Sequence, residues 1–335
     1  MKVTIIAEAG VNHNGNIVRA RKLIDIAKKC NADYVKFQSF KVEDLLLKNT
    51  KKAEYQIRNT GNEDNQYQML KKLELSEDSQ IKLKKYCSKK NINFLSTAFE
   101  IKSLNFLKSI GLKTFKIPSG EITNTPYLKH LGAFKKNIIL STGMSNLKDI
   151  DYALNILTKK GTDLNKITIL HCTTDYPTMP RDVNLKAIKT IKDEFGTKVG
   201  YSDHTLGTDI SIAAVAMGAT LIEKHFTISR NDQGPDHKAS LEPKELKELI
   251  SKIRNIEIAL GNGVKKAQKG ELKNIKIARK SIVASQKINK NEIFSEANLT
   301  TKRPGTGISA KNWDKLIGKK SKKNYQEGAI INEKI

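Results

Sequence analysis

Residues 198–225 read KVGYSDHTLGTDISIAAVAMGATLIEKH, and this stretch decides the fold. Two short strand-like runs, 198–203 and 220–225, are separated by enough residues for one helix, and charged residues and a histidine stand where each run ends. Short runs of this kind are typical of parallel strands that are buried on both faces. The stretch therefore predicts a strand–helix–strand unit whose polar groups gather at the strand ends.

The same alternation extends in both directions, nearly to residue 260. Strand candidates occur at 3–9, 33–38, 92–98, 113–119, 137–141, 167–173, 198–203 and 220–225. Helical periodicity fills the gaps between them, as in the repeated apolar positions Leu147, Ile150, Leu154 and Leu157. A long final helix is expected to begin at Pro243 and to end near Gly261.

Eight strands that alternate with helices over about 250 residues are typical of an α/β fold of the (β/α)8, or TIM, barrel type. The alternative is a doubly wound open sheet, which usually has fewer strands and often a glycine-rich phosphate loop after the first strand. Gly10 and Gly15 follow the first strand without matching that pattern. We predict a barrel over residues 1–260, a linker over 261–276 and a small separate domain over 277–335. The polar segment 41–75 is long for a loop and predicts a lid or rim.

Composition excludes several classes of protein. No apolar run approaches the roughly 20 residues of a membrane helix, and the first apolar run is too short for a secretory signal. We therefore expect a cytoplasmic protein that does not bind membranes. Cys30, Cys87 and Cys172 are odd in number and widely spaced, so they predict buried small side chains rather than disulfides or a zinc site.

The formal net charge of +25 raises the question of a polyanionic partner. Lysines occur throughout the chain, aromatic residues make up only 6%, and no aromatic platform interleaves with the basic residues. These features argue against nucleic acid as a partner. A basic field does suit a small anionic substrate, because it raises the encounter rate.

Polar residues at the predicted strand ends indicate a site, because chemistry in a barrel lies at the C-terminal ends of its strands. An unpaired buried charge costs several kcal/mol, so such a set is expected to share one site. The residues are Glu8, Lys36, Gln38, Lys116, Ser119, Glu121, Ser141, Thr174, Tyr176, Ser202, His204, Glu223 and His225.

Within this set, His204 and His225 end neighbouring strands. Two imidazoles there would hold one divalent ion and leave positions open for water and substrate, whereas a lone histidine is more often an ordinary core or surface residue. The first strand lacks the H-x-H pair of barrel metallohydrolases, which argues against hydrolysis. Lys116, Ser119, Ser141 and Ser202 supply a cation and hydroxyl donors, a combination that suits a phosphate.

Several motifs resemble those of the sialic acid synthases, in the expected order and over essentially the whole chain. They are AEAGVNHNG (7–15), VKFQ (35–38), FKIPSGE (115–121), LSTGM (140–144), HCTTDYP (171–177), YSDHT (201–205), EKHFT (223–227) and GPDHKASLEP (234–243). KRPGTGIS (302–309) resembles the antifreeze-protein-like (SAF, β-clip) domain that ends the proteins of this family.

The resemblance implies a transferase that condenses phosphoenolpyruvate with an N-acetylated amino sugar. It implies that Lys116, Ser119, Ser141, Ser202 and Thr174 hold phosphoenolpyruvate, and that His204 and His225 bind Mn²⁺ or Mg²⁺. The implied sugar site comprises Glu8, Gln38, Glu121, Tyr176 and Asp236, with Arg303 reaching over from the other subunit of a domain-swapped homodimer. For the carboxylate that orients the attacking water, Glu121 is the first candidate and Glu8 the second.

Two departures bear on the substrate. Thr174 and Phe37 stand where neuraminate-making members typically have Asn and His, which favours 2,4-diacetamido-2,4,6-trideoxymannose and a legionaminic acid product over N-acetylmannosamine and N-acetylneuraminate. The alternatives are another phosphoenolpyruvate-using synthase of keto-deoxy sugar acids and a non-catalytic basic binding protein.

Overall fold

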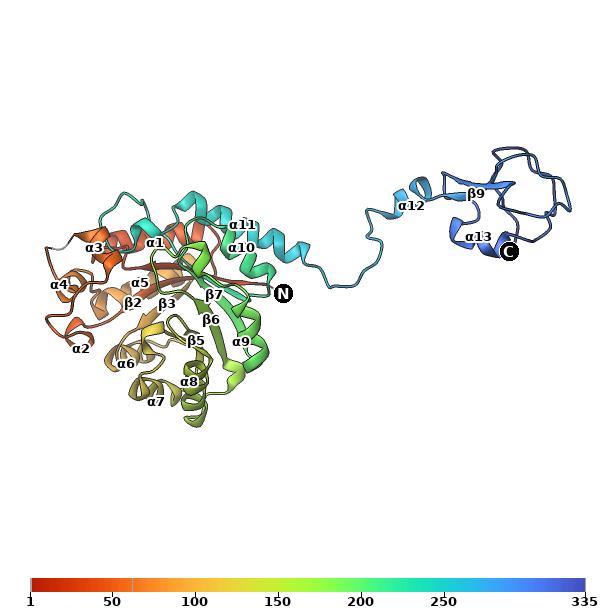
Figure 1. Cartoon of the computed structure of the whole chain (residues 1–335). Helices are drawn as coiled ribbons and strands as arrows, with labels where there is room; N and C mark the ends of the chain where they lie inside the picture. Colours follow the sequence, from red (N-terminus) through yellow and green to blue (C-terminus); the bar gives the residue numbers. More distant parts are fainter. Residues whose placement is uncertain (1, 62, 335) are drawn as a thin grey trace. The chain divides into compact units, whose positions relative to one another are not determined.

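A closed barrel of eight parallel strands forms the larger part of the protein (Figure 1). The computed structural model describes every residue except 1, 62 and 335. Each strand pairs with the next along the chain, and β8 pairs with β1 to close the barrel. The strands are β1 (Thr4–Gly10), β2 (Tyr34–Ser39), β3 (Asn93–Ala98), β4 (Thr114–Ile117), β5 (Asn137–Ser141), β6 (Ile167–Cys172), β7 (Lys198–Asp203) and β8 (Leu221–His225). The predicted (β/α)8 barrel is confirmed.

The largest difference from the predicted strands is at β4. The run 113–119 was expected to be extended throughout, but the strand ends at Ile117 and Ser119–Glu121 forms a 3-10 turn. Pro118 lies between them, and proline has no N–H to donate to a sheet. The turn moves the end of this segment away from the strand direction.

Helices surround the barrel and bury one apolar face each against the strands. They are α1 (Ile17–Lys29), α5 (Glu77–Lys90), α6 (Ile101–Ser109), α7 (Thr125–Gly132), α8 (Leu147–Lys159), α9 (Ala187–Phe195), α10 (Asp209–Ala216) and α11 (Pro243–Ala259). In α8 the Asn146 side chain caps the first turn, and Ile150, Leu154 and Leu157 are buried.

Segment 41–75, between β2 and α5, is folded rather than a bare loop. It contains α2 (Val42–Leu45), α3 (Glu54–Thr60) and α4 (Gln66–Lys71). Val42 and Leu73 from the segment pack with Val11 and Phe40 in a small apolar cluster of their own. The broken helical pattern in the sequence thus corresponds to short helices, of which α2 and α4 pack on this cluster through Leu45, Tyr67 and Leu70.

The C-terminal unit comprises Asn262–Ile335 and has a separate apolar core that includes Ile282, Phe294 and Tyr325. Its elements are α12 (Leu272–Ala278), the antiparallel strands β9 (Ser281–Ala284) and β10 (Leu299–Lys302), and α13 (Trp313–Leu316). The expected linker over 261–276 therefore includes most of a helix. The carbonyls of Lys276 and Ala278 accept hydrogen bonds from Gly305 N and Arg303 Nε, which attach this helix to the C-terminal unit.

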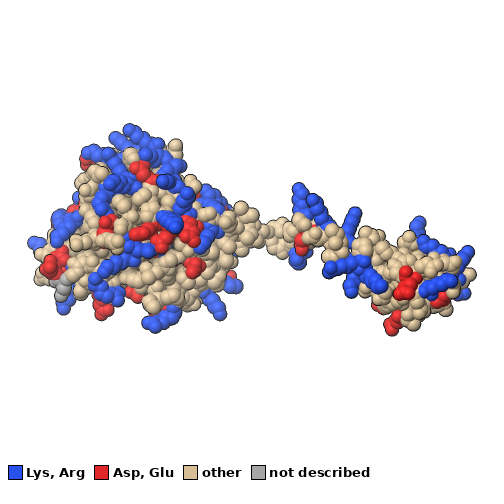
Figure 2. All heavy atoms as spheres, turned by 90° about the horizontal axis from the view of Figure 1, so that it is seen from above, with Lys and Arg blue, Asp and Glu red and all other residues tan. Residues whose placement is uncertain are grey.

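Basic side chains are distributed over the surface, with acidic side chains among them on the face that Figure 2 shows. Several basic residues pair with neighbours one helical turn away, as Lys252 does with Glu248. Across residues 2–61 and 63–334, none of the helices combines the length and the apolar character that crossing a bilayer demands.

Candidate active site

The polar strand-end residues meet in one cavity of about 270 Å³ at the C-terminal end of the barrel. Ten of the residues that were given a role from the sequence line it: Glu8, Gln38, Lys116, Ser119, Ser141, Thr174, Tyr176, Ser202, His204 and His225. These residues meet because closure of the barrel brings the C-terminal ends of all eight parallel strands to one end of the barrel.

A buried carboxylate between two ammonium groups forms the floor of this cavity. Glu223 Oε2 lies 2.5 Å from Lys36 Nζ, and its Oε1 lies 2.6 Å from Lys116 Nζ. Burial alone would raise the pKa of Glu223, but the two ammonium groups hold it well below its usual range. Burial lowers the pKa of Lys116 to about 8, against the opposing effect of Glu223. At neutral pH this trio therefore carries two positive charges and one negative charge.

Glu8 lies beside the trio, with Oε2 3.5 Å from Lys36 Nζ. Burial raises the pKa of Glu8 to about 8, although Lys36 acts in the opposite direction. Glu8 is thus mostly protonated at neutral pH and does not cancel the excess positive charge. A buried pocket with one net positive charge is suited to an anionic ligand.

Hydroxyl groups close to the trio are fixed by short contacts. Ser202 Oγ donates to Glu223 Oε1 at 3.0 Å, and Ser119 Oγ accepts from the backbone N–H of Gly143 at 2.9 Å. A Cβ at Gly143 would lie 2.9 Å from Ser119 Oγ and would also meet Thr174 Oγ1. The loop after β5 therefore needs glycine at this position to reach the two hydroxyl groups.

His204 and His225 face each other across the site, with ring centroids 5.8 Å apart. His204 Nδ1–H donates to the carbonyl of Thr173 at 2.6 Å, so Nε2 carries the lone pair. Ser202 Oγ lies 3.5 Å from this Nε2 but donates its proton to Glu223, at the shorter distance of 3.0 Å. Burial lowers the pKa of His204 to about 4 and holds that of His225 well below its usual range. Both imidazoles are therefore neutral at physiological pH, the form that binds a metal ion.

The chemistry of these two side chains fits a divalent ion. His225 Nδ1 is buried and has no hydrogen-bond partner within the described part of the chain. Over the same residues, no group of three or more His, Cys, Asp and Glu side chains has a ligand-like arrangement. The protein would thus supply two imidazole ligands and leave the other positions to water and substrate.

Asp236 lies at the edge of this site, in the loop after β8. Burial raises its pKa to about 6, and its charge contributes to the raised pKa of Glu8. The neighbouring His237 fixes the loop, since its Nδ1 lies 2.6 Å from Thr227 Oγ1 and its Nε2 lies 3.2 Å from Asn14 Oδ1. The motif after β1 and the motif after β8 therefore hold each other in place.

Besides Asp236, two further predicted residues do not line the cavity. Glu121 is the last residue of the 3-10 turn and lines a neighbouring hollow, where Asn124 Nδ2 donates to its Oε2 at 2.5 Å. Burial raises the pKa of Glu121 above its ordinary value. Arg303 belongs to the C-terminal unit, where its side chain is exposed.

Lys36, Glu223 and Thr97 also line the cavity, but they were not assigned a role from the sequence. Lys36 and Glu223 carried a signal, since each is a charged residue near the end of an apolar strand. Their pairing was not evident, because they are 187 residues apart. Thr97 has no such signal, since threonine is an ordinary strand residue.

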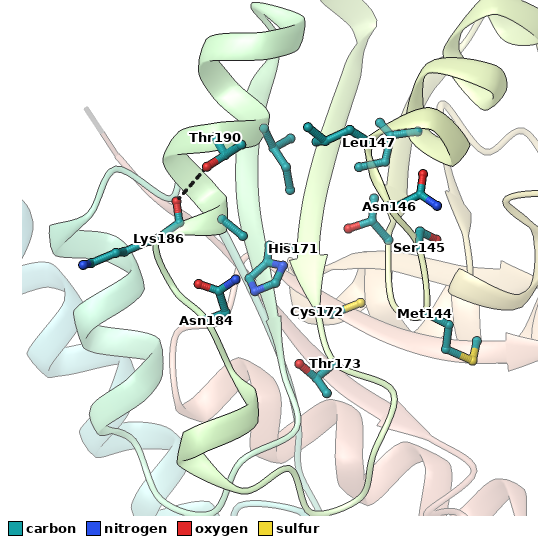
Figure 3. A pocket seen from close by; sticks show the side chains of 14 residues that line it. Met144, Ser145, Asn146, Leu147, His171, Cys172, Thr173, Asn184, Lys186 and Thr190 are labelled. Atoms are coloured by element: carbon teal, nitrogen blue, oxygen red, sulfur yellow. Dashed lines mark hydrogen bonds between the residues drawn. The ribbon is translucent and has the colours of Figure 1, made fainter.

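A second, larger cavity of about 430 Å³ lies between α8 and α9, on the other side of β6 (Figure 3). His171 stands near its middle beside Asn184, and its Nε2–H donates to the carbonyl of Val183 at 2.6 Å. Cys172 lines both cavities. The larger cavity lacks the buried ion pairs and the histidine pair, so we identify the smaller one as the candidate active site.

Fold and site together define a (β/α)8-barrel protein with a buried cationic pocket and a potential two-histidine metal site. The chain matches the NeuB family over residues 23–265 and the SAF domain over residues 279–334. It belongs to the NeuB family, and the resemblance to sialic acid synthases is confirmed.

Two relatives and one solved structure agree with this assignment. The chain is 56% identical to the N,N'-diacetyllegionaminic acid synthase of Campylobacter jejuni, over 99% of both chains. It is 44% identical to the enzyme of the same name from Legionella pneumophila, over 99% of this chain and 94% of the relative. The solved structure of the N-acetylneuraminic acid synthetase of Leptospira borgpetersenii matches this chain with a TM-score of 0.72 at 36% identity. The match covers 82% of this chain and 90% of the synthetase chain.

Proposed function

We propose that this protein condenses phosphoenolpyruvate with 2,4-diacetamido-2,4,6-trideoxymannose and water, giving N,N'-diacetyllegionaminic acid and phosphate. The observation that carries the proposal is the buried trio of Lys36, Glu223 and Lys116, whose net positive charge faces the same cavity as the two histidines. The names of the Campylobacter and Legionella relatives support this particular sugar.

Phosphoenolpyruvate would bind over the trio. Its phosphate and carboxylate match the ammonium group of Lys116 and the hydroxyl groups of Ser119, Ser141, Ser202 and Thr174. Holding the enol carbon next to the sugar aldehyde lowers the barrier by proximity alone, because a bimolecular step then becomes an intramolecular one.

Mn²⁺ or Mg²⁺ is the proposed cofactor, held by His204 and His225. Their neutral state and the unpartnered Nδ1 of His225 support this role. A bound ion of this type supplies Lewis-acid polarisation of a carbonyl oxygen.

The proposed reaction forms one C–C bond. The C3 carbon of phosphoenolpyruvate attacks the aldehyde carbon of the open-chain sugar, and the aldehyde oxygen takes up a proton. Water then adds at C2 and loses one proton. The C–O bond to phosphate breaks with its electron pair going to the phosphate, which takes the remaining hydroxyl proton, and the C2 ketone is left. Glu8 and Glu121 are the carboxyl groups available for these proton transfers. Glu8 lines the cavity and is mostly protonated at neutral pH, which suits proton donation to the aldehyde oxygen. Glu121 remains the first candidate for orienting the water, although it lines the neighbouring hollow and its carboxylate accepts a hydrogen bond from Asn124, so it would have to act from the edge of the site.

Quaternary structure and location complete the proposal. Gln38, Tyr176 and Asp236 would contact the sugar, and Arg303 would reach it from the second subunit of a domain-swapped homodimer. The exposed side chain of Arg303 supports its availability to a second copy. A cytoplasmic location, where phosphoenolpyruvate is available, is part of the same proposal. Light scattering tests the dimer, with a monomer at working concentration as the contrary result.

Phosphate release by the purified full-length protein tests the function. The reaction contains phosphoenolpyruvate, Mn²⁺ and either 2,4-diacetamido-2,4,6-trideoxymannose, N-acetylmannosamine or a phosphorylated aldose without an acetamido group. We expect the highest kcat/KM with the diacetamido sugar. Preference for N-acetylmannosamine would reassign the substrate, preference for the aldose phosphate would favour a keto-deoxy sugar acid synthase, and no release with any sugar would refute the proposal.

A further inference from the structure

Tyr55 lies on α3, within segment 41–75, and its ring contacts Tyr176 in the active site. The two ring centroids are 5.0 Å apart, with an angle of 32° between the ring planes. The Tyr176 ring in turn lies 4.1 Å from the His204 ring. The Tyr176 ring also meets the ring of the second site histidine, His225, edge to face, with centroids 5.9 Å apart. The Tyr176 ring therefore joins α3 to both site histidines, with the closer contact to His204.

The Tyr176 ring depends on its neighbours for its orientation. His204 has an anchor of its own, the hydrogen bond from Nδ1–H to the Thr173 carbonyl. Within the described residues, Tyr176 makes a hydrogen bond through its backbone N–H, to Asp175 Oδ1 at 3.0 Å, and none through its hydroxyl group. The Tyr176 ring is therefore positioned by packing, and Tyr55 supplies one of the packing surfaces.

Helix α3 is itself firmly attached on two sides. The buried ammonium group of Lys52 donates to Thr60 Oγ1 and to the Gly61 carbonyl, each at 3.0 Å, and pairs with Asp64. Asn59 Nδ2 donates to the Pro235 carbonyl at 2.6 Å, directly before Asp236. Tyr55 is thus held in a fixed relation to the loop that carries Asp236, which makes it a rigid support rather than a mobile contact.

We infer that Tyr55 is a positioning residue for the amino sugar and that it acts by holding the Tyr176 ring beside His204. This inference rests on the proposed function, in which Tyr176 contacts the sugar. An aromatic pair of this kind changes an equilibrium constant by about twofold to tenfold. The effect is confined to the sugar, because the phosphate-binding residues and the hydrogen bond of His204 do not involve Tyr55.

The test compares Tyr55→Ala, Tyr55→Phe and Tyr67→Ala in the full-length protein. Tyr67 is the matched control, because it lies on α4 of the same segment and packs on the cluster of Val11, Phe40, Val42 and Leu73. We expect Tyr55→Ala to raise KM for the sugar about fivefold, with KM for phosphoenolpyruvate and Mn²⁺ affinity, measured by electron paramagnetic resonance, within about twofold of wild type. Tyr55→Phe keeps the ring and is expected to restore KM for the sugar.

Three results would overturn the inference. They are an unchanged sugar KM in Tyr55→Ala, an equal rise in Tyr67→Ala, and a Tyr55→Phe variant that behaves like Tyr55→Ala. A parallel loss of Mn²⁺ affinity and phosphoenolpyruvate binding would also contradict it, because it would indicate general damage to the site. The wild-type protein separates the two proposals: without turnover of any amino sugar the proposed function fails, whereas normal wild-type turnover with unaffected Tyr55 variants refutes the role of Tyr55 alone.

Discussion

Replacing Glu223 with Gln should destabilise the barrel strongly at neutral pH. The carboxylate contacts two ammonium groups at 2.5 and 2.6 Å, and all three side chains are at most 6% exposed. Removing one partner of a buried ion pair costs about 3–5 kcal/mol. A second estimate agrees with this range. A lysine left without its carboxylate can lose its proton instead of staying charged, and for a lysine of ordinary pKa this costs about 4.6 kcal/mol at pH 7. This value is an upper limit for the free-energy cost of removing the carboxylate.

The stability deficit should also depend on pH, with a definite sign. In Glu223→Gln one lysine is expected to be neutral in the folded protein and protonated in the unfolded chain. The unfolded state then binds more protons, so raising the pH stabilises the variant. We expect the deficit to shrink by about 1 kcal/mol between pH 7 and pH 8, because the gain of about 1.4 kcal/mol in the variant is partly matched by the wild-type Lys116, which begins to lose its proton over the same interval. Above pH 8 it should level off, because the wild-type Lys116, with a folded pKa of about 8 and a higher unfolded pKa, then loses its proton on folding as well.

Urea unfolding at pH 7 and pH 8 measures these free energies of unfolding. Far-ultraviolet circular dichroism is the suitable signal, because the single tryptophan, Trp313, lies in the C-terminal unit. Glu248→Gln is the control, since its pair with Lys252 is about half exposed and solvent screening leaves such a pair with little effect on stability. A deficit below about 1 kcal/mol for Glu223→Gln, or one that is equal at pH 7 and pH 8, would refute the reasoning.

Three further predictions concern the cofactor, the substrate pocket and the wall of the barrel. His204→Ala and His225→Ala should each weaken Mn²⁺ binding at least about tenfold, because each variant removes one of two protein ligands. Electron paramagnetic resonance of free Mn²⁺ measures the affinity, and an unchanged affinity would contradict the metal site. Gly143→Ala should raise KM for phosphoenolpyruvate about tenfold without unfolding the protein, since the added methyl group displaces the hydroxyl of Ser119. Steady-state kinetics measure KM and a circular dichroism spectrum checks the fold; a wild-type KM is the contrary result. Lys224→Met should lower the free energy of unfolding by about 3–5 kcal/mol, because it leaves the fully buried Asp203 without the ammonium group 2.9 Å away. Urea unfolding measures this loss, and a loss under about 1 kcal/mol would contradict the prediction.

Much of the fold was determined by local sequence. The runs 137–141 and 198–203 are strands with the predicted bounds, because short apolar runs between helical segments have few other ways to bury their side chains. The location of the site could also be predicted from the sequence. Burying polar residues at the ends of strands costs free energy unless these residues contact one another, so they were expected to share one site. Segment 41–75 was the least predictable part, because its helices depend on residues from outside it. Helices α2 and α4 pack with Val11 and Phe40, and α3 is tied to the Pro235 carbonyl through Asn59.

The sequence by itself determined which side chains end the strands, and therefore which groups would lie at one end of a barrel. Only the tertiary structure decided how those groups pair: Glu223 on β8 reaches Lys36 on β2 and Lys116 on β4, and Tyr55 reaches Tyr176. It also decided their charge states, since the pKa of Glu8 rises to about 8 and that of Glu223 falls although both are buried glutamates on neighbouring strands. The physical reason is that pairing and desolvation depend on distances between remote residues, which closure of the barrel sets and a local pattern does not encode.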